Sequence, residues 1–438
     1  MFLKRLADFN RPFGNYLGFF LVLSVTVFFW NEALTRWLSG AVVFFGALWF
    51  FVKGREFRFF YPVIVFYFVL VSEVITWLLV TQGDSVLGDG LLKLDALAKI
   101  FIFLPFGWVL YKNESHVTPF IFFSAFGAAF MCLVPTGAIE QLVSFLKLFP
   151  HLAGSRFEFG YDNSEFLGFF SGFSLIILVF FAKRFYDFFS GHRYIFLGVY
   201  FFITLMLFAG LFAAQTRAAF LGLFVATIFS VIWWFYFLFK NRDKRHVPWL
   251  GSLLPLVLLV LVSLSFGKVW QDRAIGDAPA FKELKQLNFN DVPETSVGMR
   301  IYLWQAAVPA ILERPFFGWG HDGSFTSLNQ SAIPENVIKN TGHYHNTILD
   351  LLVRQGLVAL VLILSVYGWI AFQIVVAYRR GNVPIDFLMF FFAFIVYFAV
   401  TNQFESYLLY TAGAFASNLV LGLAMYYIFK DRRVLANK

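Results

Sequence analysis

Two histidines separated by one residue, His343 and His345, stand directly before Asn346 and an apolar run. A histidine with an ordinary pKa of about 6.5 can accept a proton at neutral pH. Elsewhere in the chain, Arg217 and Arg300 carry planar guanidinium groups, whose shape suits a diphosphate. If folding unites these side chains, the arginines would stabilise a departing diphosphate and a histidine would take the proton of an acceptor hydroxyl. The set therefore suits transfer from a lipid diphosphate.

Several other chemistries lack their usual residues. His343 and His345, with His321 or Asp322, could bind zinc, but histidines at i and i+2 share a face only in an extended segment. The chain has no HExxH motif, and we expect no metal. The single cysteine, Cys132, excludes an intrachain disulfide. The GxSxG motif of serine hydrolases and the GxxxxGK[ST] motif of nucleotide binding are also absent.

The positions of the charged residues leave two alternative functions open, glycoside hydrolysis and a channel or transporter. Glycoside hydrolysis needs two facing carboxylates, and the acids expected outside the cytoplasm are too scattered to support or exclude it. Those acids are Glu32, Asp84, Asp89, Asp162, Glu165, Asp322, Glu335 and Glu405. A channel or transporter usually carries charges in mid-span, which are sparse here: Glu73, Lys99 and Arg354.

The composition is that of a polytopic membrane protein. Of the 438 residues, 60% are hydrophobic, 64 are phenylalanine and only 14% are charged, against about a quarter charged in soluble proteins. A helix needs roughly 20 apolar residues to cross a bilayer. We therefore predict an all-α membrane domain over residues 1–438, with about twelve transmembrane helices. The predicted spans are 16–30, 38–52, 59–80, 95–111, 117–136, 165–182, 194–214, 218–239, 248–266, 353–377, 384–401 and 408–429.

Lysines and arginines orient these spans. Twenty basic residues fall in one set of short loops and ends, whereas the opposite set, apart from one long loop, holds Arg36, Lys147, Arg156 and Arg217. Because basic loops stay in the cytoplasm, both termini are predicted to be cytoplasmic. The net charge of +8 then faces the anionic membrane lipids, and we expect no nucleic acid partner.

The long loop, residues 267–345 between spans nine and ten, is predicted to lie outside the cytoplasm, which is the periplasm of a Gram-negative cell. Phe281, Leu284 and Leu287 share one helical face, which favours a short helix on the membrane surface. The loop also places His343 and His345 outside the cytoplasm, where no ATP is present. Any chemistry there must use a preactivated substrate.

A second helix is predicted farther along this loop. Arg300 and Trp304 are four residues apart and share a helical face. Pro315, Gly318 and Gly320 end that helix in a tight turn. A glycine-rich turn can cradle an anion, although a helix end followed by a loop is the simpler interpretation.

These motifs together resemble the O-antigen ligase and polymerase superfamily, which also includes O-linked protein oligosaccharyltransferases. The ligase signature is His, then Asn, Ser or Gln, nine residues, and Gly-x-x-Gly. Here it appears as His345, Asn346, nine residues and Gly356, with Ala359 in place of the second glycine. The family's upstream arginine is similar to Arg217.

The family's other elements are also present. Its Arg–Trp helix followed by Pro and a Gly-x-Gly turn is similar to the segment from Arg300 to Gly320, and residues 157–168 resemble its Gly…Asn-Glu stretch with Ser164 inserted. The resemblance implies a GT-C-like, metal-independent inverting transferase without cofactor. It implies His345 as the base and Arg217 with Arg300 on the diphosphate. The remaining candidate substrate contacts are Asn346, His343, Trp304 and Trp319, although an outer tryptophan is usually a membrane-interface anchor.

The resemblance also implies the partners and the site of action. The donor would be a glycan linked to undecaprenyl diphosphate and the acceptor lipid A–core, at the periplasmic face of the bacterial inner membrane. One dominant outer loop favours a ligase over a polymerase, which tends to have two sizeable arginine-rich loops. A polymerase using the same chemistry and a non-enzymatic flippase or exporter of lipid-linked glycan are the alternatives.

Overall fold

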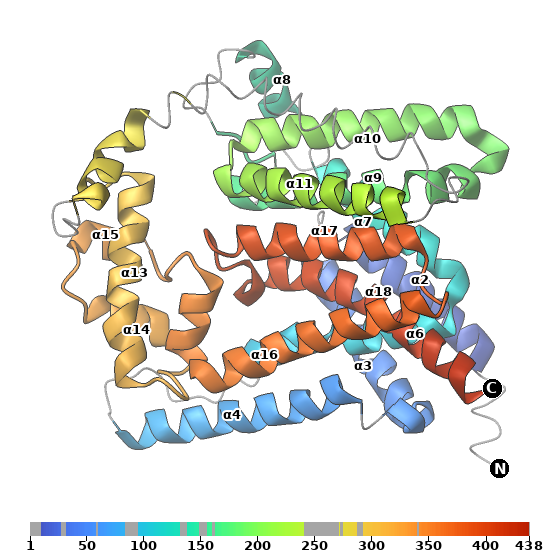
Figure 1. The fold of residues 1–438 in the computed structure, drawn as a ribbon, viewed down its shortest axis with the longest axis horizontal. Helices are drawn as coiled ribbons and strands as arrows, with labels where there is room; N and C mark the ends of the chain where they lie inside the picture. Colours follow the sequence, from blue (N-terminus) through green and yellow to red (C-terminus); the bar gives the residue numbers. More distant parts are fainter. Residues whose placement is uncertain are drawn as a thin grey trace.

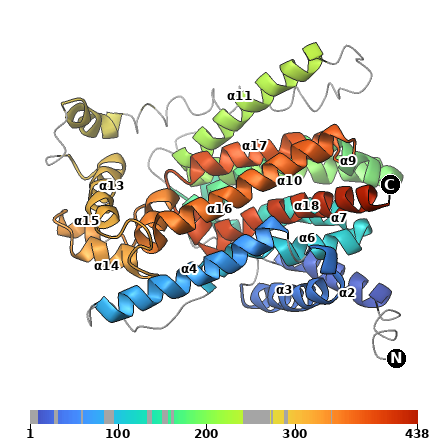
Figure 2. The same ribbon diagram turned by 60° about the horizontal axis from the view of Figure 1, so that its bottom comes forward.

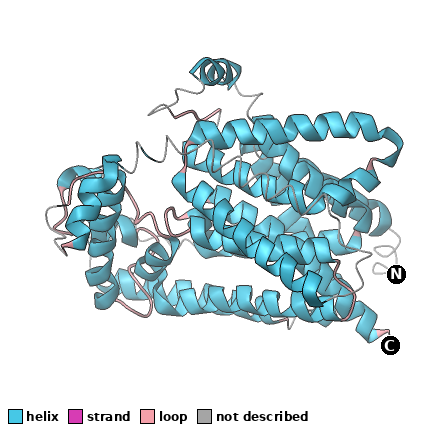
Figure 3. Ribbon diagram, turned by 45° about the horizontal axis from the view of Figure 1, so that its top comes forward, coloured by secondary structure: helices cyan, strands magenta, loops and turns pink. Residues whose placement is uncertain are grey.

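The computed structural model consists of helices and loops, and its described residues form no strand (Figure 3). The residues described are 10–27, 32–57, 60–83, 95–131, 138–148, 156–159, 163–240, 271, 275–286, 292–339 and 341–437. The predicted span 248–266 and Leu287 lie outside these residues. The predicted span 95–111 is divided into three short helices, at Asp95–Ala98, Lys99–Phe101 and Phe103–Lys112, and each of the other predicted spans overlaps one longer helix. The all-α part of the fold prediction is therefore confirmed for the described chain.

Most of the described helices form a bundle whose members run along a common direction (Figures 1 and 2). They are α2 (Asn10–Val27), α3 (Glu32–Lys53), α4 (Tyr61–Gly83), α6 (Phe103–Lys112), α7 (Val117–Met131), α9 (Ser164–Phe188), α10 (Arg193–Ala214), α11 (Arg217–Lys240), α16 (Thr347–Arg379), α17 (Ile385–Thr401) and α18 (Thr411–Ala436). The remaining α-helices are α5 (Asp95–Ala98), α8 (Ala138–Leu148), α13 (Ser296–Glu313), α14 (Gly323–Asn329) and α15 (Glu335–Lys339), with an unlabelled one at 275–285.

Six of the described helices are long and apolar enough to cross a membrane by length and composition. Three shorter apolar helices lie within α2, α3 and α17. A helix satisfies its backbone polar groups internally, which is what lipid requires of a spanning segment. These helices are consistent with an integral membrane protein, while the full count of twelve spans stays a prediction.

Close backbone approach holds the centre of the bundle together. A side chain at Gly107 in α6 would come within 2.5 Å of Met425 Cβ and 2.8 Å of the Gly422 carbonyl oxygen in α18. Small residues at helix contacts allow such packing, which in lipid replaces the hydrophobic effect as the main attraction between helices. Tyr397 of α17 donates to the Phe169 carbonyl of α9 at 2.8 Å, and their rings stack.

One end of the bundle gathers the basic residues that orient the protein. Arg184 at the end of α9 donates to both oxygens of Asp386 at 2.8 and 3.0 Å and to Tyr427 at 3.1 Å. Arg380, after α16, donates to Asp431 of α18 at 2.8 Å. The C-terminal end of α18 lies at this end, opposite α13–α15 (Figure 1). The ends of α9, α16 and α18 therefore lie at the same end of the bundle.

The opposite end carries a smaller unit made of α13, α14 and α15 (Figure 1). Its own core includes Leu303, Ala307, Trp319, Leu328 and Tyr344. This unit comes from within the predicted outer loop, residues 267–345. That the loop lies in the periplasm stays a prediction.

A break in α16 attaches this unit, which we call the outer unit, to the bundle. Gly356 has a φ of 73°, so residues 357 and 358 cannot donate to carbonyls 353 and 354 as in a continuous helix. Residues 315–320 satisfy all four groups. Their bonds are Leu357 N to Pro315 O and Val358 N to Phe316 O at 2.8 and 3.2 Å, and Trp319 N to Val353 O and Gly320 N to Arg354 O, both at 2.8 Å.

Candidate active site

The loop before α16 sets the position of the two histidines. Asn346 is the N-cap of α16: its Oδ1 accepts from Ile348 N and Leu349 N at 3.0 and 3.2 Å. The helix begins at Thr347, so the predicted start at residue 353 was wrong. Polar residues in the first turns, including Asp350, concealed that start from an apolar pattern. Asn346 therefore has a capping role, and its predicted contact with substrate stays a prediction.

Asp350 ties three segments together at this point. It is fully buried and accepts from Ser324 Oγ at 2.6 Å, from Tyr344 N at 3.1 and 3.2 Å, and from Ser406 Oγ. A buried carboxylate is costly unless it is hydrogen-bonded. These donors come from α14, from the histidine loop and from the loop after α17. Asp350 thus fixes the latter two loops relative to each other.

His345 adopts an unusual backbone conformation, with a φ of 47°. Left-handed backbone is uncommon outside glycine and is often found where function constrains a residue. In this conformation His345 Nδ1 lies 2.7 Å from Glu405 Oε2. His343 Nε2 lies 2.6 Å from the other oxygen, Oε1, of the same carboxylate. One glutamate therefore holds both imidazoles, whose ring centroids are 4.1 Å apart.

The two histidines determine the charge of Glu405. Burial alone would raise the pKa of this carboxyl, but the hydrogen bonds with His343 and His345 outweigh burial and bring its pKa well below the usual range. Ser406 N also donates to Oε1 at 2.9 Å. Glu405 is thus ionised at neutral pH although its side chain is only 6% exposed.

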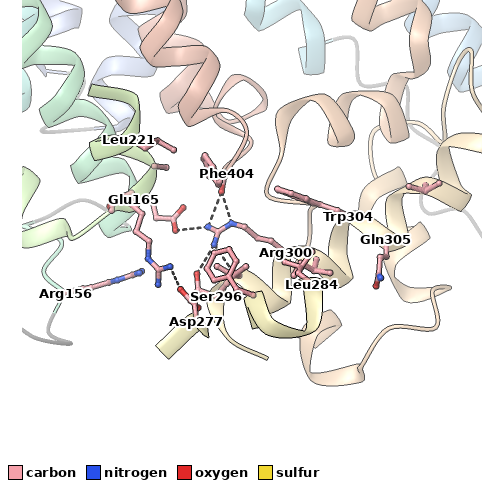
Figure 4. Close-up of a pocket in the computed structure, with 17 residues that line it drawn as sticks. Arg156, Glu165, Leu221, Asp277, Leu284, Ser296, Arg300, Trp304, Gln305 and Phe404 are labelled. Atoms are coloured by element: carbon pink, nitrogen blue, oxygen red, sulfur yellow. Dashed lines mark hydrogen bonds and ion pairs between the residues drawn. The ribbon is translucent and has the colours of Figure 1, made fainter. Parts of the chain in front are cut away.

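The two arginines line one cavity of about 720 Å³ (Figure 4). Arg217 begins α11 and pairs with the buried Asp277. Arg300 of α13 donates to the Phe404 carbonyl at 3.2 and 3.4 Å and lies 3.8 Å from Glu165 of α9. The rest of the lining is largely apolar: Thr216, Ala218, Leu221, Phe281, Leu284, Ser296, Val297, Ile301, Trp304, Gln305, Val308 and the arginine Arg156.

The cavity and the histidine loop adjoin through two backbone contacts. Phe404, whose carbonyl accepts from Arg300, immediately precedes Glu405. Trp304, which lines the cavity, donates from Nε1 to the Tyr344 carbonyl at 3.2 Å. Folding therefore brings together the regions of Arg217, Arg300 and His345, which are far apart in the sequence.

The structure places the other candidate residues in different surroundings. Trp319 is 7% exposed in the core of the outer unit and donates to the Ala310 carbonyl at 2.8 Å, outside the cavity lining. His321 and Asp322 lie 3.9 Å apart and belong to no histidine cluster among the described residues. The N–H groups of Trp319 and Gly320, in the glycine turn, bind carbonyls of α16, so the simpler interpretation of that turn holds.

His343, His345 and Glu405 are the one group among the described residues whose geometry could hold a metal ion. Their ligand atoms lie within 4.8 Å of one another, and two histidines with a glutamate are a donor set that suits zinc. A nitrogen of each histidine already faces a carboxylate oxygen at hydrogen-bond distance. The same atoms therefore also form a complete hydrogen-bonded set without an ion.

Sequence reasoning missed three acidic partners. Glu165 and Glu405 appeared only among scattered outer acids, yet both adjoin the site, as does Asp277. The contact between His345 and Glu405 joins residues 60 positions apart, which no local pattern reveals. One available signal was that Glu405 is the single charged residue between the last two predicted spans.

Residues 201–364 match the O-antigen ligase family model. The resemblance expected from the sequence is thus confirmed over a segment that contains Arg217, Arg300 and His345. An uncharacterized protein of Haemophilus influenzae is 29% identical over 136 residues, which cover 30% of this chain. The match spans a third of that relative's length. Glu165 and Glu405 lie outside the O-antigen ligase match.

Proposed function

We propose that this protein is an inverting glycosyltransferase that moves an O-antigen glycan from undecaprenyl diphosphate to a hydroxyl of lipid A–core. The proposal takes the site to lie at the periplasmic face of a bacterial inner membrane. The observation that carries it is the largely apolar cavity lined by Arg217 and Arg300, whose lining residue Phe404 directly precedes Glu405, the partner of His345. An apolar wall suits a polyprenyl chain, and two guanidinium groups suit its diphosphate.

In the proposed reaction, His345 acts on the acceptor hydroxyl, and Arg217 and Arg300 act on the leaving diphosphate. The acceptor hydroxyl oxygen attacks the anomeric carbon while its proton passes to His345. The bond from that carbon to the diphosphate oxygen breaks, and the electron pair leaves with the diphosphate. Arg217 and Arg300 stabilise the charge that develops there. The energy comes from the donor, so the step needs no nucleotide.

The glycolipid profile of a deletion strain tests this function. A ligase loss leaves long lipid-linked polymer and core without a ladder. Core bearing a single repeat would indicate a polymerase instead, and single repeats trapped on the cytoplasmic side would indicate a flippase.

Complementation of that strain tests the base. We expect His345→Ala to abolish transfer at an unchanged protein level, because no other group would take the hydroxyl proton. Full activity of the variant would contradict the assignment of His345 as the base.

The wild-type activity of the purified protein should survive EDTA. Loss of activity in EDTA that is restored by zinc would favour a metal site.

A further inference from the structure

The histidine pair and its glutamate form part of a continuous chain of four side chains. Tyr410 Oη lies 2.9 Å from His343 Nδ1. His343 Nε2 lies 2.6 Å from Glu405 Oε1, and Glu405 Oε2 lies 2.7 Å from His345 Nδ1. In the described part of the chain, His345 Nε2 ends this series without a hydrogen-bond partner. The series is therefore directional, from Tyr410 to one free ring nitrogen.

The ionised carboxylate determines which nitrogens carry hydrogen. A carboxylate can only accept, so His343 Nε2 and His345 Nδ1 must both be N–H donors. In the neutral rings, the remaining nitrogens are then acceptors. His343 Nδ1 accepts from the Tyr410 hydroxyl, and His345 Nε2 keeps its lone pair. The network thus assigns both tautomers.

We propose that Glu405 and His343 are positioning residues for His345, an inference that rests on the proposed function. Glu405 fixes the tautomer that leaves Nε2 free and stabilises the imidazolium that forms. His343 donates to the other carboxylate oxygen and so limits how strongly Glu405 attracts the His345 proton.

The proton balance is complete within this arrangement. When the acceptor oxygen bonds to the anomeric carbon, its O–H bond breaks and the proton joins His345 Nε2. The imidazolium then pairs with the Glu405 carboxylate, which itself stays unprotonated, as does the buried aspartate of the serine protease triad. The proton later leaves from Nε2 to solvent, since His345 is 23% exposed.

Other charged groups face this set from each adjoining element. Glu165 of α9 interacts with the Glu405 side chain, and Arg300 of α13 lies 3.8 Å from Glu165. Asp350 and Arg354 of α16 act on Tyr410, which precedes α18. Because these groups interact, a pH–rate profile reports an apparent pKa of the cluster. The test therefore compares the apparent pKa of each variant with that of the wild type and does not interpret absolute pKa values.

Two variants shift the profile in opposite directions if the inference holds. Glu405→Gln removes the negative charge, destabilises the imidazolium and moves the acidic limb of kcat to lower pH. It should lower kcat strongly, toward the loss of about 10⁴-fold that the wrong tautomer causes in a serine protease triad, with KM for the donor changed little. His343→Phe keeps a ring beside His345 but removes a donor to Glu405. It should lower kcat less and move the limb to higher pH.

The experiment uses the purified full-length chain, with kcat and KM measured against pH. Glu335→Gln, at an exposed acid of α15, is the matched control and should leave the profile unchanged. Unchanged kcat in Glu405→Gln, or limbs that move in the same direction, would overturn the inference. If Glu405→Gln fails to fold, the direction of the His343→Phe shift still decides. An inactive His345→Ala beside a fully active Glu405→Gln would overturn this inference alone, whereas an active His345→Ala would overturn the proposed function itself.

Discussion

At the scale of single residues, protein groups engage both of the arginines that line the cavity. Arg217 pairs with Asp277, while Arg300 uses its fork on the Phe404 carbonyl and its Nη1 on Ser296. A diphosphate must therefore share or displace these partners. These partners hold each guanidinium group in the cavity lining, which lowers the cost of organising the site on binding.

We expect Arg217→Ala and Arg300→Ala each to reduce turnover by about 10²-fold or more, as loss of a charge-stabilising donor does. The Lys substitutions should retain part of the activity, because they keep the charge but lose the planar fork. Transfer assays on purified protein measure this. Arg314→Ala is the control, since that guanidinium lies over the Trp319 ring outside the cavity lining. Wild-type activity in all four site variants would mean that no diphosphate contact exists.

The sequence contained the types of these side chains but not their pairing. Arg217 and Arg300 were predicted from the shape of their guanidinium groups and from the family resemblance, and His345 from its motif. Glu405 escaped because a carboxylate becomes informative only when its neighbours are known. The roles of Asn346 and Trp319 were also hidden, since capping and core packing depend on where a helix starts and which face it buries.

At the scale of elements, α16 begins directly after the histidine loop and also holds the attachment of the outer unit. Its break at Gly356 exposes four backbone groups that residues 315–320 satisfy. The sequence predicted this helix as a continuous span from residue 353. It could not predict the break, because one glycine in an apolar run is compatible with an unbroken helix.

We expect Gly356→Ala to destabilise the protein by on the order of 2 kcal/mol or more, through positive φ and steric overlap. An added Cβ would lie 2.2 Å from the Phe316 carbonyl oxygen. Gly368, in the same helix, has nothing within 4 Å of such an atom, so Gly368→Ala should be neutral or slightly stabilising. Thermal unfolding in detergent compares the two. Equal melting temperatures would show that the break does not need glycine.

At the scale of the whole molecule, the two ends of the bundle carry different features. Basic residues near Arg184 and Arg380 occupy one end, and the cavity occupies the other. Composition and loop charge were sufficient to predict this division. They could not give the second core of the outer unit, because its residues are joined by contacts across a long loop.

Cysteine labelling tests the orientation of this division. In a Cys132→Ser background, Glu335→Cys lies on α15 and Asp187→Cys near the opposite end of α9, and both native side chains are exposed. We expect a membrane-impermeant maleimide added to intact spheroplasts to label only the first. Labelling of Asp187→Cys alone would place the cavity in the cytoplasm, and permeabilised cells serve as the control.

The main-chain bonds around Gly356 join the outer unit to α16, whose two helical parts together span 33 residues. Arg300 belongs to the outer unit, whereas Arg217 lies at the start of α11. A long helix adjusts its tilt to bilayer thickness, so the spacing of the two guanidinium groups should respond to the host lipid. We expect turnover in nanodiscs to depend on acyl chain length with an optimum, and a flat response would show that the two helices tilt together.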